Sequence, residues 1–202
     1  MHIRLSLLLL STFALPAQAA TLVVDLRDAT GAALADAVVS VRAIGRSTPR
    51  PAGFPWGSEV VQQNIRFEPA VLIVPVGTAV GFPNRDAVRH HVYSFSAPKR
   101  FDLKLYGGES TRKILFDKTG TVALGCNIHD RMQGFLRIVD TAWANRSDAR
   151  GRVTIDGITP GAVALTVWHS GARAKNQEAR FDIVVPAAGS ISRSITVPLR
   201  AR

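Results

Sequence analysis

The chain has 202 residues, a length that suits one large domain or two small ones. Hydrophobic residues make up 47% of it and charged residues 20%, so the composition is that of a globular protein and excludes a disordered chain. Its 25 basic and 15 acidic residues give a formal net charge of +10 at pH 7, which favours an acidic protein partner or an anionic membrane surface.

Residues 1–20 have the layout of a secretory signal peptide. His2 and Arg4 begin a short basic stretch, residues 5–15 are apolar, and residues 17–19 form a small-x-small cleavage motif. The apolar run is too short to span a membrane, and no other segment approaches the roughly 20 apolar residues that a transmembrane helix needs. We therefore expect a soluble, exported protein, periplasmic if the source is Gram-negative, for which nucleic acid is not the partner.

The rest of the chain predicts an all-β fold. Short alternating or β-branched runs are separated by turn residues, and no stretch has a sustained 3.6-residue period. Closely spaced short strands favour a sandwich or a barrel. The predicted strands are residues 21–26, 37–42, 71–74, 79–82, 91–95, 113–116, 121–124, 135–139, 152–155, 163–168, 180–185 and 190–197.

Two breaks divide the chain into three parts. Residues 47–57 are rich in Pro and Gly and are typical of a linker, and residues 141–150 turn polar. The two terminal parts each have too few strands to bury a core alone. We therefore expect residues 58–140 to form one β-sandwich, inserted in or packed beside a small sandwich made of residues 21–57 and 141–202.

The two flanking parts carry strand and turn motifs of their own. Residues 23–28 with Gly31 form one such motif, and residues 151–157, followed by Pro160-Gly161 and residues 163–168, form another. They resemble the opening and the later half of a carboxypeptidase-regulatory-like, or transthyretin-like, β-sandwich domain. The resemblance implies a structural sandwich that carries the middle part as an insertion.

The single cysteine of the chain lies in the middle part, in a Cys-x-x-His-x-x-Met string formed by Cys126, His129 and Met132. One cysteine cannot close an intramolecular disulfide, so the thiol is buried and inert, part of an intermolecular bridge, or bound to a metal. Earlier in the chain, His90 and His91 stand at the start of another predicted strand. Two imidazoles, a thiolate and a thioether could meet at one end of a sandwich, and they are the ligands of a blue-copper centre.

Further motifs surround these residues. They are Phe67-Glu68-Pro69, the pattern Val74-x-x-Gly77-x-x-Val80-x-Phe82-x-Asn84, Asn84-Arg85-Asp86 before His90, and Thr119-Gly120-Thr121 before Cys126. Together they resemble the cupredoxins over about residues 65–140, and the short Cys-x-x-His-x-x-Met loop is similar to that of amicyanin. The resemblance implies a Greek-key cupredoxin sandwich with one type 1 copper ion, held by His90, Cys126, His129 and Met132.

The choice between the two adjacent histidines follows from the resemblance. Cupredoxins carry the ligand two places before an inward valine, here Val92, and strand alternation puts His90 on the face of Val92 and His91 on the other. Cupredoxins usually carry Asn at the position of His91, so the contacts that tie the ligand loops together stay open. Arg131, beside Met132, places a positive charge near the expected copper edge.

The resemblance implies a periplasmic electron carrier and no catalysis, because four protein ligands leave no open position for a substrate. By analogy His129 is the electron port, with Ile128 and either Phe54 or Trp56 in an apolar patch around it. The implied partners are redox proteins, either a c-type cytochrome or a dehydrogenase of methylamine utilization.

Two other classes of function stay open. The chain could be a binding or structural module of the envelope whose copper site is vestigial or serves copper storage. It could also be an enzyme with a nucleophilic pair of Cys126 and a histidine, although the sequence shows no third orienting group and no strand-to-helix elbow. A dinuclear copper site needs a second cysteine, and a multicopper oxidase needs more histidines than the four that remain after removal of the signal peptide.

Overall fold

The computed structural model describes residues 19–109 and 111–201. The predicted signal peptide, residues 1–20, lies almost entirely outside the described residues. Within the described part of the chain, no helix is both long and apolar enough to cross a membrane.

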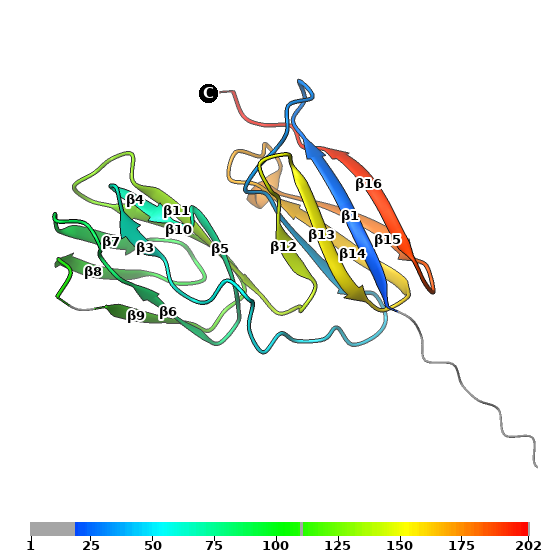
Figure 1. The fold of residues 1–202 in the computed structure, drawn as a ribbon, viewed down its shortest axis with the longest axis horizontal. Coiled ribbons are helices and arrows are strands. Elements are labelled where there is room, and N and C mark those ends of the chain that lie inside the picture. The colour runs from blue at the N-terminus through cyan, green and yellow to red at the C-terminus, as the bar shows by residue number, and fades with distance from the viewer. Residues whose placement is uncertain (1–18, 110, 202) are drawn as a thin grey trace, which may run out of the picture.

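The fold is all β, as the sequence predicts (Figure 1). One short 3-10 helix, η1 (Lys175–Gln177), interrupts the described strands. The strands are β1 (Ala20–Arg27), β2 (Val38–Ala43), β3 (Val61–Gln63), β4 (Arg66–Glu68), β5 (Val71–Pro75), β6 (Thr78–Phe82), β7 (His90–Ser94), β8 (Phe101–Tyr106), β9 (Arg112–Phe116), β10 (Gly120–Cys126), β11 (Gln133–Val139), β12 (Ala144–Arg146), β13 (Arg152–Ile158), β14 (Gly161–Trp168), β15 (Glu178–Val185) and β16 (Ser190–Thr196).

The strands from the two ends of the chain form a sandwich that we call the outer unit (β1, β2 and β12–β16). One sheet has the order β13-β1-β16 and the other the order β12-β2-β14-β15. Buried and half-buried residues alternate along β1, as a strand with one inward face requires. Leu22 and Val24 of β1 share a core with Val163 and Leu165 of β14, so the two ends of the chain build one hydrophobic core.

The strands between them form a second body, which we call the inner unit (β3–β11). A five-stranded sheet has the order β5-β11-β10-β7-β8, and two-stranded ladders pair β3 with β4 and β6 with β9. Gly77, with φ 89°, makes the predicted turn between β5 and β6, which favours glycine because its φ is positive. Cys126 and Met132 belong to the buried core of this unit, at the end where β10 stops and β11 starts.

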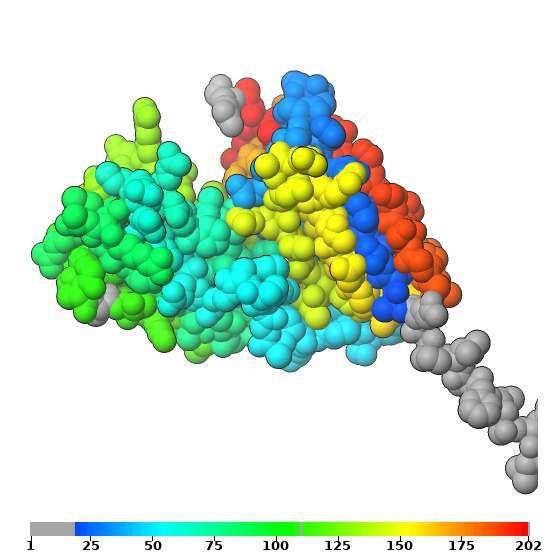
Figure 2. Space-filling view, in the orientation of Figure 1, coloured from blue at the N-terminus to red at the C-terminus, as the bar shows by residue number. Residues whose placement is uncertain are grey.

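The two units meet along a buried apolar junction. Its buried members are Val38, Val71, Ile73, Val139, Ala144 and Trp168, with Phe54 and Phe135 packed against them. Arg137 of β11 reaches across it, with one guanidinium nitrogen 2.8 Å from a carboxylate oxygen of Glu178 and its carbon 5.3 Å from the centre of the Trp168 ring. Residues 44–60 run across the junction on the side that Figure 2 presents.

Candidate metal centre

Three donor atoms converge at one end of the inner unit. His90 begins β7, Cys126 ends β10, and His129 lies in the loop that follows. The Nδ1 atoms of the two imidazoles are 3.2 Å apart, and Cys126 Sγ lies 3.8 Å from Nδ1 of His90 and 3.6 Å from Nδ1 of His129. The sequence-predicted histidine and cysteine ligands are thus brought together in space.

The spacing of these atoms fits a metal ion. A point equidistant from the three atoms lies about 2.1 Å from each, within the range of about 2.0–2.3 Å that imidazole nitrogen and thiolate sulfur make to a borderline-soft cation. Two imidazoles and one thiolate in a triangle are the in-plane ligands of a type 1 copper site. The distances between the donor atoms and the types of donor therefore both fit such a site.

Strand pairing fixes the two buried donors. Cys126 is opposite Val92 in the antiparallel pair of β10 and β7, two residues after His90. The ring of Tyr93 lies over Gly125, where an added Cβ would come within 2.8 Å of the ring. Glycine is required at this position because any side chain would push the ring away from the strand that carries the cysteine.

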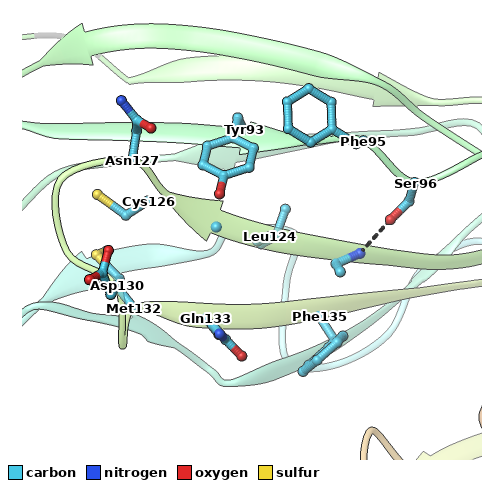
Figure 3. Close-up of a pocket in the computed structure, with 12 residues that line it drawn as sticks. Tyr93, Phe95, Ser96, Leu124, Cys126, Asn127, Asp130, Met132, Gln133 and Phe135 are labelled. Atoms are coloured by element: carbon cyan, nitrogen blue, oxygen red, sulfur yellow. Dashed lines mark hydrogen bonds between the residues drawn. The ribbon is translucent and has the colours of Figure 1, made fainter.

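Met132 closes the ligand loop. Its amide donates a hydrogen bond to the carbonyl oxygen of His129, at 2.9 Å, so the loop turns back towards β11. The Met132 side chain is 1% exposed and packs in the same core as Cys126. Both residues line a groove of about 530 Å³. Figure 3 shows their sulfur atoms at one end of it, with Tyr93 and Phe95 along one side.

The second ring nitrogen of His90 is held by Asp86, a residue for which the sequence predicted no role. Nε2 of the fully buried His90 lies 2.8 Å from Asp86 Oδ2, and the same carboxylate accepts hydrogen bonds from the amides of Asn64 and Ile65 at 2.7 and 3.0 Å. An ionised carboxylate can only accept hydrogen bonds, so Asp86 keeps the ring proton of His90 on Nε2. The lone pair of Nδ1 is then free to bind a metal. The sequence pointed to Asp86 only through its place in the Asn84-Arg85-Asp86 motif, four residues before His90.

The environment of Asp86 also keeps it charged. Burial acts to raise the pKa of this carboxyl, but the hydrogen bonds from Ile65, His90 and Asn64 together hold the pKa below its usual value. The acceptor is therefore ionised at neutral pH.

His91 points away from the three donors. Its Nε2 lies 2.6 Å from Asp102 Oδ1 on the outer face of β7 and β8. Hydrogen bonds from Lys104, and then the one from His91, hold the pKa of Asp102 well below its usual value. The main chain of His91 does tie the ligand loops together, because its carbonyl oxygen accepts the amide of Asn127 at 3.2 Å. A backbone contact thus joins the loops here.

Exposed apolar side chains lie in the loops at this end of the inner unit. Ile128, next to His129 in sequence, is 51% exposed, as a surface patch requires, and Ile65 and Val88 are exposed in the loops that carry the Asp86 contact and lead into His90. The expectation that Phe54 or Trp56 joins this patch is wrong. The two rings stack on each other, and the indole of Trp56 donates to the carbonyl oxygen of Ile73 at the junction between the units.

Comparison with known proteins gives matches to solved structures only, since no family model and no curated protein matches. A purple cupredoxin from Nitrosopumilus maritimus is 21% identical over 41% of this chain and 100% of its own, with a TM-score of 0.38. The Cu(I) form of an amicyanin variant is 22% identical over 46% of this chain and 97% of its own, with a TM-score of 0.38.

A copper-containing nitrite reductase from Thermus scotoductus is 28% identical over 48% of this chain, with a TM-score of 0.40, and the match spans 25% of that enzyme. Because all these TM-scores are low, we infer the function from the donor geometry.

Proposed function

We propose that this chain binds one copper ion through His90, Cys126, His129 and Met132 and carries single electrons between redox partners outside the cytoplasm. The observation that carries the proposal is the triangle formed by the two histidine Nδ1 atoms and the cysteine Sγ. These three atoms all lie within 4.8 Å of one another. Copper, when bound, supplies a one-electron couple between its Cu(II) and Cu(I) states.

The protein contributes a site that is already arranged. His90 is fully buried and Cys126 is 5% exposed, so little of either residue meets solvent. Asp86 fixes the ring of His90, and the pairing of β7 with β10 fixes the backbone of Cys126. A rigid mixture of soft sulfur and imidazole donors suits both oxidation states, so the ligands move little when an electron passes. A closed ligand set leaves no position for a substrate, and we propose no catalysis.

Electrons would enter and leave at His129. It is the donor residue nearest to solvent, and the apolar rim of Ile65, Val88 and Ile128 gives a partner a surface to dock against. A redox protein such as a c-type cytochrome or a dehydrogenase fits this proposal. We also propose that the inner and outer units are the two domains expected from the sequence and that the chain works in the periplasm.

A cysteine nucleophile is the second candidate that the geometry raises. The expectation that no third group orients the pair is wrong, because Asp86 holds His90, whose Nδ1 lies 3.8 Å from Cys126 Sγ. The burial of both side chains argues against it, since a substrate must reach the sulfur. His129, which crowds the same sulfur at 3.6 Å, has no role in such a pair.

Titration of the purified protein with Cu(II), followed by absorption and by metal content, tests the proposal. We expect one copper per chain and an intense thiolate-to-copper charge-transfer band in the visible range. Cys126→Ser should remove the band, and Zn(II) should occupy the site without colour. Reversible one-electron voltammetry would separate an electron carrier from a copper store. Absence of both the band and the bound copper would contradict the proposal and would favour the second candidate, in which Cys126 is a nucleophile.

A further inference from the structure

Strand β15 ends the four-stranded sheet of the outer unit, and its second edge pairs with no described strand. Its eight residues pair with β14 in an unbroken register from Glu178 to Val185, without a bulge. Figure 1 shows β15 and β16 running to the right-hand margin of the outer unit. A regular edge of this length offers a row of main-chain donors and acceptors to another strand.

This edge lacks the protection that the edges of β5 and β8 have. Proteins block edges with proline, charged side chains (lysine above all), bulges or covering segments, and the charges of β15 are of both signs, so they can pair with each other. On β8, Lys104 has a φ of 57° and the pairing with β7 shifts register, while Trp56 covers β5 by donating to its Ile73 carbonyl. The sequence of β15 contains neither proline nor lysine, and it exposes Val184 at 68% and Phe181 at 36%.

An apolar seam lies beside the edge. A cavity of about 320 Å³ opens between β15 and β16, and its apolar lining comes from Leu165, Phe181, Ile183 and Ile195. Phe181 is opposite Leu165 of β14, a core residue, so its ring points to the inner face of the sheet and towards this seam. A strand added at β15 would bring a further side chain over the seam.

The charges of β15 select a second β15 as that strand. In an antiparallel pair centred on Phe181, Arg180 of each copy stands directly opposite Asp182 of the other, and opposite charges in this position stabilise a sheet. Moving the two-fold axis by one residue sets two arginines or two aspartates opposite each other. Within one chain, Arg180 Nε already lies 3.3 Å from Asp182 Oδ1, and both side chains are 65% exposed. Pairing would join these two surface pairs into one network.

We propose that the chain forms a two-fold dimer through β15, which joins the two four-stranded sheets into one continuous sheet. Residues directly opposite in an antiparallel pair lie on the same face, so the two Phe181 rings meet on the inner face and cover the two seams. The interface is isologous and closed, which stops further addition at this edge. The proposal uses no residue of the metal centre and stands or falls independently of it.

Sedimentation of the full exported chain, with charge variants, tests the interface and its register. We expect a mass twice that of one chain, and a dissociation constant raised at least about tenfold by Arg180→Asp or by Asp182→Arg. The double variant R180D/D182R restores opposite charges and should recover most of the affinity. Lys113→Asp, with the same change of charge in the inner unit, is the control and should leave the affinity unchanged.

Cross-linking gives a second readout that does not depend on affinity. Opposite residues in the pair have Cα atoms about 4.5–5.5 Å apart, which suits a disulfide. Phe181→Cys should therefore form a covalent dimer under mild oxidation. Val184→Cys is exposed on the same strand but faces position 178 of the other copy, and it should not. A chain that sediments as a monomer up to about 100 μM, a dimer indifferent to the charge variants, or equal cross-linking of both cysteines would overturn the proposal.

Discussion

The carboxylate of Asp86 lies 2.8 Å from Nε2 of His90 and also accepts hydrogen bonds from the amides of Asn64 and Ile65, so one side chain joins the β3–β4 turn to the imidazole that we propose as a copper ligand. Removing such a partner typically weakens metal binding by about 10–100-fold. We expect Asp86→Asn to lower copper affinity within that range, because an amide is uncharged and places an N–H donor against groups that are themselves donors.

A competition titration against a copper chelator measures this loss. Asp102→Asn is the matched control, since it removes the same charge from the other imidazole–carboxylate pair, His91 with Asp102 at 2.6 Å. It should leave copper affinity unchanged. Equal losses in the two variants would show that Asp86 acts only through the overall charge of the protein.

The two adjacent histidines should differ completely in their effect on the site. Nδ1 of His90 faces Cys126 Sγ, whereas His91 lies on the opposite face of β7. We therefore expect His90→Ala to abolish the thiolate-to-copper band, and His91→Ala to keep it with unchanged intensity. Copper absorption spectra of the two variants, recorded beside thermal unfolding curves, distinguish a lost ligand from a lost fold. A band that disappears only in His91→Ala would reverse the assignment.

Arg137 should contribute strongly to the stability of the junction. Its guanidinium is almost fully buried between Glu178 and Trp168, and burial lowers its pKa from the usual value. Arg137→Met leaves Glu178 without its partner, and we expect the free energy of unfolding to fall by about 2–3 kcal/mol, less than for a fully buried pair because Glu178 is 36% exposed.

Urea denaturation measures the change. Arg152→Met breaks the ion pair with Asp25 on the surface of the outer unit, and solvent screening leaves such exposed pairs a much smaller effect on stability. If the two variants are equally stable, the buried arginine does not hold the units together.

Much of the candidate metal centre could be predicted because its proposed ligands are close in sequence or fixed by strand alternation. Cys126, His129 and Met132 lie in or beside one loop, and the cupredoxin resemblance together with period-two alternation separates His90 from His91. The role of Asp86 could not be predicted in this way. An acid in a loop is most often solvated, and only the fold shows which ring nitrogen faces it.

The sequence predictions that were wrong or incomplete also have physical causes. Composition marked residues 47–57 as a linker but could not give their path, so Trp56 was assigned to the metal end although it covers β5. Strand β8 was missed, and Lys104 within it adopts a φ of 57°, a left-handed conformation that local propensity does not foresee. Strands β3 and β4 have three residues each, too few to show a period.

His169 should make stability depend on pH away from the metal centre. It is half-buried, its Nδ1 accepts the amide of Gly171 at 3.1 Å, and burial lowers its pKa from 6.5, with Asp36 opposing the shift weakly. The unfolded imidazole therefore takes up a proton at a higher pH than the folded one, so the free energy of unfolding falls as the pH drops below 6.5 and levels off below the folded pKa. Protonation also removes the acceptor for the Gly171 amide.

His169→Gln tests this dependence because glutamine cannot titrate. Denaturant midpoints of this variant, measured between about pH 7.5 and 5, should depend less steeply on pH than those of the unchanged protein. Because the two proteins differ only at position 169, the difference between the two curves reports on His169. Parallel curves would mean that the folded protein leaves this imidazole as free to ionise as the unfolded chain does.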